Sequence, residues 1–125
     1  YFKATHYYEA PLLVIGMVLD ELAQTKQPLS TILTPNTNYS HTGEINFEVQ
    51  DKTAAIARLK KHFISQSPHI IDIDCMTMEF SGEQGDWWFN IRPSNTEDLL
   101  RLNLEASTQE IMREKQQEIE TIIKQ

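Results

Sequence analysis

The fold of this chain is decided by residues 87–106, which read WWFNIRPSNTEDLLRLNLEA. Apolar and polar residues alternate in two segments of this stretch. The apolar sets are Trp87, Phe89 and Ile91 in the first segment, and Leu100, Leu102, Leu104 and Ala106 in the second. Alternation with a period of two is typical of β-strands with one buried face. The polar residues between the segments favour a turn, so the stretch predicts a β-hairpin.

The tip of this hairpin carries side chains that suit a phosphate group. Arg92 offers a planar fork that can bind two phosphate oxygens at once. Ser94 and Thr96 add hydroxyl donors, Asn95 adds an amide donor, and no carboxylate lies between Arg92 and Thr96. A tight turn can also aim backbone N–H groups at an anion. On residue chemistry alone, the alternative of a solvated tip that only turns the chain stays open.

The sequence of the tip and of the segment after it resembles the C-terminal signature of the α-D-phosphohexomutases. Residues 92–97 read RPSNTE and are followed by DLLRLNLEA, whereas the family has an Arg-x-Ser-(Asn/Gly)-Thr-Glu-Pro loop before a strand that ends in Glu-Ala. Residues 40–46, SHTGEIN, and the helix predicted after them are most similar to the bacterial phosphomannomutase branch. Two positions differ from the family pattern, since Asp98 replaces the usual Pro and Asp74-Cys75 replaces the usual Asp-Gly.

The resemblance implies the C-terminal fragment of a phosphohexomutase of the phosphomannomutase/phosphoglucomutase type. Such an enzyme is an intramolecular phosphotransferase that interconverts hexose 1-phosphate and hexose 6-phosphate. Arg92, Ser94, Asn95 and Thr96 would bind the phosphate that is not being transferred, on a phosphosugar such as mannose or glucose phosphate. The family carries its phosphoserine and its Mg²⁺ ligands in other domains, and neither motif occurs in this sequence. We therefore expect no catalytic residue and no metal ligand here, and no activity from the chain alone.

Length, charge and cysteine content narrow the classes of function. The 125 residues suffice for one ordinary domain, or for a small domain with part of another, and a hydrophobic content of 40% suffices for a core. A net charge of −7 argues against a nucleic-acid partner, which requires a basic stripe. The single Cys excludes an internal disulfide and fits a reducing, cytoplasmic location. The four His residues lack metal-ligand spacing.

The N-terminal stretch predicts a helix over Tyr7–Ala23 that is apolar around most of its circumference. Such a helix is normally buried between other elements. The resemblance assigns residues 1–38 to the helical tail of the third mutase domain plus a linker, Thr34–Asn38, so the chain would be a piece of a longer protein. Away from the other domains of that protein, we expect the helix to self-associate or to remain mobile.

The sequence predicts no membrane partner. The longest apolar run, Pro11–Leu19, is far shorter than the roughly 20 residues of a membrane-spanning helix.

Residues 39–125 predict the C-terminal phosphate-binding domain. A first strand alternates through Ile45, Phe47 and Val49, and Asp51 or Thr53 can cap the helix that follows. This helix ends before Pro68 and has an apolar series at helical spacing, namely Ile56, Leu59, Phe63 and Ile64. A second strand runs from Ile70 to Phe80, with a turn or bulge at Asp74-Cys75, where the parity of the apolar positions switches.

The remaining elements follow from turn and capping signals. Ser81–Gly85 predicts a turn into the strand where Trp87 and Trp88 point to opposite faces, and Ser107–Glu110 has the spacing of a capping box. The last helix has Glu114 and Glu118 on its wet side and an apolar stripe with a lysine at its edge: Ile111, Met112, Lys115, Ile119, Ile122 and Ile123. The order β-α-β-β-β-α predicts an α+β fold, a four-stranded antiparallel sheet with two helices on one face. The resemblance implies a TATA-binding-protein-like fold.

Two functions of other classes stay open. One is a non-catalytic protein-interaction domain that uses the exposed sheet face and the tryptophan pair. The other is a TATA-binding-like nucleic-acid module, which the acidic charge disfavours. Arg101 is a weaker phosphate-binding candidate than Arg92, because its strand position favours a cross-strand pair with an acidic residue.

Overall fold

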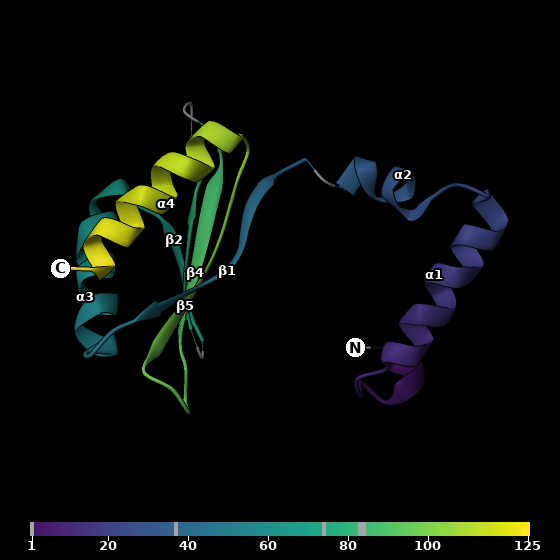
Figure 1. Ribbon diagram of the computed structural model, residues 1–125, viewed down its shortest axis with the longest axis horizontal. Helices are drawn as coiled ribbons and strands as arrows, with labels where there is room; N and C mark the ends of the chain where they lie inside the picture. Colours follow the sequence, from purple (N-terminus) through teal and green to yellow (C-terminus); the bar gives the residue numbers. More distant parts are fainter. Residues whose placement is uncertain (1, 37, 74, 83–84) are drawn as a thin grey trace. The chain divides into compact units, whose positions relative to one another are not determined.

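The computed structural model describes residues 2–36, 38–73, 75–82 and 85–125. The chain forms two compact units, Tyr1–Asn38 and Tyr39–Gln125, and each unit is described by itself (Figure 1). None of the described helices is long and apolar enough to cross a membrane.

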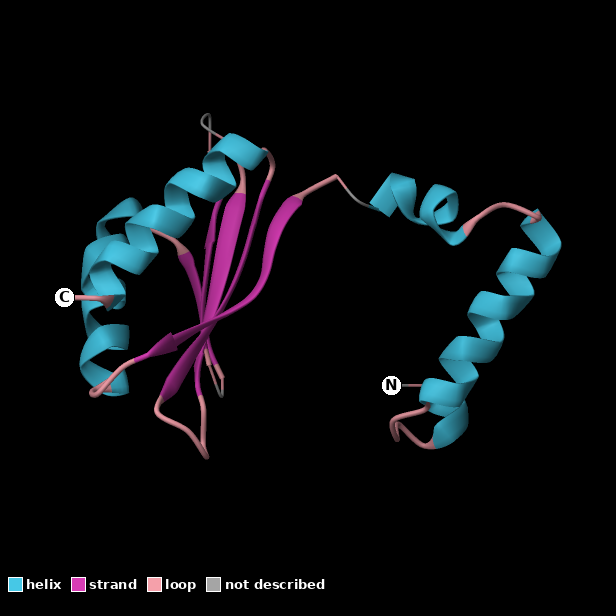
Figure 2. Ribbon diagram, in the orientation of Figure 1, coloured by secondary structure: helices cyan, strands magenta, loops and turns pink. Residues whose placement is uncertain are grey.

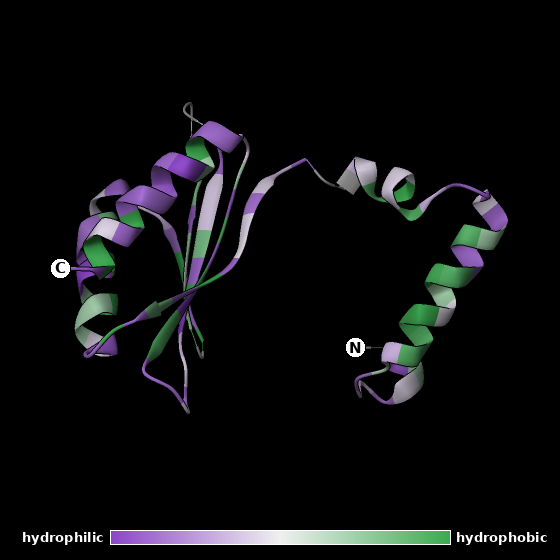
Figure 3. Cartoon of the chain, in the orientation of Figure 1, coloured by the Kyte–Doolittle hydropathy of each residue, from purple (hydrophilic) through white to green (hydrophobic). Residues whose placement is uncertain are grey.

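The first unit is helical. Its elements are η1 Lys3–Thr5, α1 Pro11–Thr25, α2 Leu29–Leu33 and η2 Thr34–Asn36. The predicted helix Tyr7–Ala23 was wrong at its start, because Tyr7 has a left-handed φ of 64° and the helix begins at Pro11. Proline favours the first helical turn, where its fixed φ fits and its missing N–H would have no partner. Hydrophobic residues follow α1 along much of its length (Figure 3), and none of its side chains is buried.

The predicted linker is partly structured. Its first three residues form η2, and Thr37 lies outside the described residues.

The second unit contains an antiparallel five-stranded sheet in the order β1-β5-β4-β3-β2. Figure 2 shows its strands in magenta. Its strands are β1 Ser40–Glu48, β2 His69–Asp72, β3 Met76–Phe80, β4 Trp87–Pro93 and β5 Leu99–Ala106. The prediction of four strands was therefore wrong. The predicted second strand is two strands, because the chain reverses after Asp72 and pairs it with Met76. Asp74, and residues 83 and 84 of the predicted Ser81–Gly85 turn, lie outside the described residues.

One face of this sheet forms the core, as the alternation predicts. Four β5 side chains are at most 1% exposed: Leu100, Leu102, Leu104 and Ala106. The ring of Phe63 lies 5.4–5.7 Å, centroid to centroid, from three rings of the sheet: Phe80, Trp87 and Phe89. Trp87 is buried and Trp88 is only half-buried, which confirms that the two tryptophans point to opposite faces.

Two helices cover this apolar face (Figure 1): α3 Lys52–Phe63, followed by η3 Ile64–Gln66, and α4 Gln109–Ile123. The N-cap of α3 is Asp51, whose carboxylate accepts a hydrogen bond from the Ala54 amide at 2.9 Å. Arg58 joins the helices by donating to the carbonyls of Ile122 and Ile123, both at 3.2 Å. The α+β class with both helices on one face is confirmed.

The capping prediction for α4 was wrong by one residue. Thr108, not Ser107, is the N-cap and accepts a hydrogen bond from the Ile111 amide at 3.3 Å. Ser107 is held one residue before the helix, because its amide donates to the Asp86 carbonyl at 2.8 Å.

Candidate functional site

The predicted phosphate-binding residues lie where β4 and β5 meet. The two strands pair as far as Pro93 and Leu100, and the Ser94 amide donates to the Leu99 carbonyl at 2.9 Å. Arg92 and Pro93 therefore belong to β4, and the irregular loop is shorter than predicted. Proline is tolerated at this strand end. The ordered strand below the loop thus holds the backbone of Arg92.

Arg92 has a free guanidinium on the sheet face opposite the core. It is exposed, while its neighbour Ile91 is fully buried. Among the residues that the structure describes, Arg92 has no hydrogen bond or ion pair. A charged donor group on a paired strand is therefore available to an anion from outside the chain.

Arg101 lies directly opposite Arg92 in the strand register. Like charges in that relation repel one another. Arg101 is already neutralised, since its guanidinium lies 3.4 Å from a carboxylate oxygen of Glu44 and 3.5 Å from one of Glu97. This pairing agrees with the prediction that Arg101 forms a cross-strand pair with an acidic residue.

The other three predicted residues differ in accessibility. Ser94 is only 8% exposed, whereas Asn95 and Thr96 are exposed. A surface hollow of about 440 Å³ is lined by Cys75, Arg92, Pro93 and Asn95. The structure thus brings Arg92 and Asn95 together, while Ser94 and Thr96 are not among the residues that line this hollow.

The loop backbone leaves donors free but does not form the nest expected of a tight turn. No residue from 94 to 98 has positive φ, which the alternating αR–αL nest requires. The amides of residues 95–98 donate no hydrogen bond to any described residue. Several N–H groups are therefore available beside Arg92.

Lys52 is a loop-contacting residue that the sequence did not reveal. Its ammonium donates to the carbonyls of Glu97 and Ser94, at 2.8 and 3.1 Å. The contact is long-range, because Lys52 begins α3 more than forty positions earlier in the chain. The sequence offers only a weak signal for this contact, because a lysine at the first position of a helix is electrostatically disfavoured.

The described residues do not fit the Mg²⁺ site that the family implies. Within the described ranges, no three His, Cys, Asp or Glu side chains gather closely enough to hold a metal ion. The acids nearest the loop are dispersed, with Glu97 beside Arg101 and Asp98 beside Lys52.

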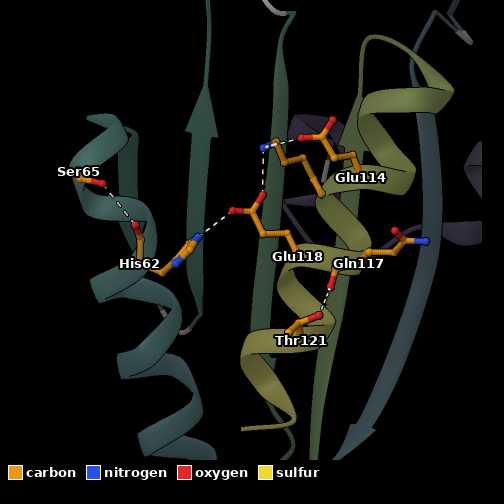
Figure 4. A network of polar contacts seen from close by, with 7 residues as sticks. His62, Ser65, Glu114, Gln117, Glu118 and Thr121 are labelled. Carbon is orange, nitrogen blue, oxygen red and sulfur yellow. Dashed lines mark hydrogen bonds and ion pairs between the residues drawn. The ribbon is translucent and has the colours of Figure 1, made fainter.

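A second polar cluster joins α3 to α4 (Figure 4). His62 Nε2 lies 2.7 Å from Glu118, and Lys115 Nζ lies 3.0 Å from Glu118 and 3.3 Å from Glu114. The Lys115 ammonium also lies 5.3 Å from the centre of the Trp87 ring, within cation–π range. The prediction that Glu118 faces water was wrong, because α3 packs beside this flank of α4 and leaves the side chain 28% exposed.

The charges of this cluster stabilise one another. Partial burial alone would raise the pKa of Glu118, but hydrogen bonds from His62 and Lys115 outweigh it and lower the pKa below its ordinary value. Partial burial would likewise lower the pKa of Lys115, but the hydrogen bond with Glu118 and the other acidic contacts raise it. The charges of this cluster are therefore satisfied by one another.

Comparison with known proteins identifies the fold family. Residues 44–122 match the family described as phosphoglucomutase/phosphomannomutase, C-terminal domain. The match covers more than half of the chain, so the chain belongs to this family. This finding confirms the resemblance seen in the hairpin and in the segment that follows it.

Individual relatives agree with the family match. The chain is 40% identical to a phosphomannomutase of Methanocaldococcus jannaschii, over 98% of the chain and 26% of the relative. It is 35% identical to a Xanthomonas campestris protein named "Phosphohexose mutases" and 31% identical to a phosphomannomutase of Salmonella typhimurium, in both cases over 85% of the chain and 23% of the relative. The chain spans about a quarter of the length of these curated relatives.

Proposed function

We propose that this chain is the C-terminal part of a phosphohexomutase of the phosphomannomutase/phosphoglucomutase type. In this proposal the parent enzyme interconverts hexose 1-phosphate and hexose 6-phosphate. The loop with Arg92, Ser94, Asn95 and Thr96 binds the substrate phosphate that is not being transferred. The family match and the names of the relatives support the enzyme class.

The free guanidinium of Arg92 carries the proposal for the loop. Arg101, directly across the strand pair, already has two carboxylates, whereas Arg92 has no described partner. A phosphate beside Arg92 would neutralise its unpaired charge and accept a bidentate pair of hydrogen bonds. Asn95 lines the same hollow and adds a neutral amide donor.

This role fits what a phosphoryl-transfer enzyme requires of a site remote from the reacting phosphate. Such catalysis consists mainly of positioning and charge stabilisation. When the loop holds one phosphate, the distance across the sugar decides which hydroxyl reaches the phosphoryl donor. The bisphosphorylated sugar must then turn over, and the loop holds the other phosphate in the second half-reaction. Recognition by phosphate donors alone permits both orientations.

The reacting groups belong to other domains in this proposal. The family's phosphoserine would supply the phosphoryl group, and its Mg²⁺ would stabilise negative charge on that group. We therefore expect the purified 125-residue chain to show no turnover of mannose 1-phosphate. Turnover that co-purifies with the chain and is absent from a mock preparation would contradict this expectation.

Residues 1–38 are proposed to be the tail of the preceding domain and its linker. Within the first unit α1 has no buried side chain, and Leu12 is 82% exposed. An apolar surface of this kind favours association. We expect α1 to pack on another copy of the chain or to remain mobile, and a clean monomer in light scattering together with a rigid helix would contradict this.

A titration distinguishes this function from a protein-interaction domain. Mannose 6-phosphate is added to the ¹⁵N-labelled chain while amide chemical shifts are followed, with mannose as the matched control that lacks phosphate. We expect shifts centred on residues 92–96 with mannose 6-phosphate only. No shifts, or shifts spread over the open sheet face, would favour the protein-interaction domain.

A further inference from the structure

Lys52 contacts both ends of the loop that follows Pro93. Its ammonium donates to the Ser94 carbonyl at one end and to the Glu97 carbonyl at the other. The Lys52 side chain is 27% exposed, so much of it is held against the protein. A single ammonium with three donors can satisfy both carbonyls at once.

Lys52 makes these contacts from a position in α3 that is electrostatically unfavourable for a lysine. Lys52 is the first residue of α3, where the helix end carries partial positive charge and acidic residues are preferred. Fixing a lysine side chain also costs rotamer entropy. The carbonyls of the loop are the partners that compensate, because they approach the ammonium most closely.

The nearby carboxylate of Asp98 is a weaker partner. It lies 3.7 Å from the Lys52 ammonium and its side chain is 93% exposed. Exposed ion pairs of this kind contribute little.

The two carbonyl contacts also fix the direction of two amides. No described peptide bond is cis, and in a planar trans peptide the C=O and the following N–H point in opposite directions. Turning the carbonyls of Ser94 and Glu97 toward Lys52 therefore turns the amides of Asn95 and Asp98 away from it. These amides belong to the group that has no described acceptor.

We propose that Lys52 is a positioning residue of the phosphate-binding loop: it holds the loop backbone in the form that presents its donors to the phosphate. This inference rests on the proposed function. A loop without Lys52 populates the binding-competent form for a smaller fraction of time, and the apparent Kd rises in proportion to that loss. Lys52 itself does not contact the phosphate in this role.

The test is the mannose 6-phosphate titration of the chain and four variants. Lys52→Met removes the ammonium but keeps the length of the side chain, and Lys52→Arg keeps a charged donor. Lys60→Met is the matched control, because Lys60 is another α3 lysine and pairs with Asp72 instead of the loop. Arg92→Ala reports on the proposed function itself. The melting temperature of every variant is measured alongside.

We expect Lys52→Met to raise the Kd about tenfold, as for a loop that is competent about a tenth of the time. We expect Lys60→Met to leave the Kd unchanged and Lys52→Arg to recover most of the loss. A merely structural lysine would lower the melting temperature without changing the Kd.

Two results overturn the inference in distinguishable ways. If Arg92→Ala loses binding while Lys52→Met binds as Lys60→Met does, the proposed function stands and the role of Lys52 falls. The role also falls if Lys52→Arg recovers none of the loss. If the unmodified chain does not respond to mannose 6-phosphate, or Arg92→Ala binds normally, the proposed function fails and the role of Lys52 falls with it.

Discussion

The end of the β4–β5 hairpin and the α3–α4 cluster both contain charged side chains, but they differ in whether these side chains are paired. In the cluster, Lys115 and Glu118 have partners within about 3 Å, and each group shifts the pKa of the other so that both remain charged. At the hairpin, Arg92 has no partner among the described residues. A concentration of charge can therefore consist of groups that only pair with one another. The proposed phosphate site depends instead on an unpaired charge on an ordered strand.

Cavity size favours the α3–α4 cluster instead. The hollow beside the α3–α4 cluster is about 770 Å³ and includes His62 and Glu118, while the hollow beside Arg92 is about 440 Å³. The larger space is bordered by His62, Glu114 and Glu118, which pair within the cluster, and by Lys61, which has no hydrogen bond or ion pair with a described residue. The smaller one contains the unpaired guanidinium of Arg92, which, unlike an ammonium, can bind two phosphate oxygens at once.

The largest effect is expected from Arg92→Ala in the complete parent enzyme. Each charge-assisted hydrogen bond contributes roughly 1.5–3 kcal/mol, so catalytic efficiency should fall about 10- to 150-fold. The loss should appear mainly in KM, because the loop would hold the phosphate equally in the ground state and the transition state. Arg92→Lys should recover only part, since an ammonium lacks the fork. Steady-state kinetics measure this effect, and unchanged efficiency in a folded Arg92→Ala enzyme would contradict it.

A smaller effect, on stability alone, is expected from Glu118→Ala. This change removes the acceptor of His62 and Lys115 and should lower the free energy of unfolding by about 1–2 kcal/mol. Glu114→Ala is the matched control on the same helix, because the Glu114 side chain is 72% exposed, and it should cost less than about 0.5 kcal/mol. Urea denaturation measures both values. Equal values for the two variants would show that the cluster does not hold the helices together.

The smallest effect is the pH dependence of the difference in unfolding free energy between the unmodified chain and Glu118→Ala. The pKa of Glu118 is lowered in the folded chain, so its contribution is complete above the ordinary value of 4.5 and is lost as the pH falls through the lowered pKa. The pKa of Lys115 is raised, so its contribution is complete below 10.5 and is lost as the pH rises through the raised pKa. The stability difference between the unmodified chain and Glu118→Ala should be flat near neutrality and shrink below pH 4.5. A difference that grows in acid would contradict the assigned direction.

The hairpin could be predicted from sequence because its alternation is long and one face is fully buried. The number of strands could not be predicted. β2 is short, and a switch in the parity of the apolar positions does not distinguish a bulge within one strand from a turn between two strands. The start of α1 was missed because Tyr7 and Tyr8 continue the apolar pattern, whereas Pro11 sets the boundary.

Some residues of the candidate site could be predicted from the sequence and others could not. Arg92 and its neighbours form a contiguous segment, so their donors could be recognised along the chain. Lys52 meets the loop only through the packing of α3 beside the sheet, and a helical lysine has no local pattern that names its partner. Glu118 was misplaced for a related reason, since only the position of α3 shows that this flank of α4 is covered.

The most direct test compares the two arginines that face each other across β4 and β5. The Kd for mannose 6-phosphate is measured by amide shifts in the unmodified chain, in Arg92→Ala and in Arg101→Ala. The loss of Arg92, which is unpaired, should raise the Kd much more than the loss of Arg101, which is paired. We expect Arg92→Ala to weaken binding at least about tenfold. Arg101→Ala should weaken it by at most about fivefold, the range of a surface ion pair. Equal losses in the two variants, or no loss in Arg92→Ala, would contradict the assignment of the phosphate to Arg92.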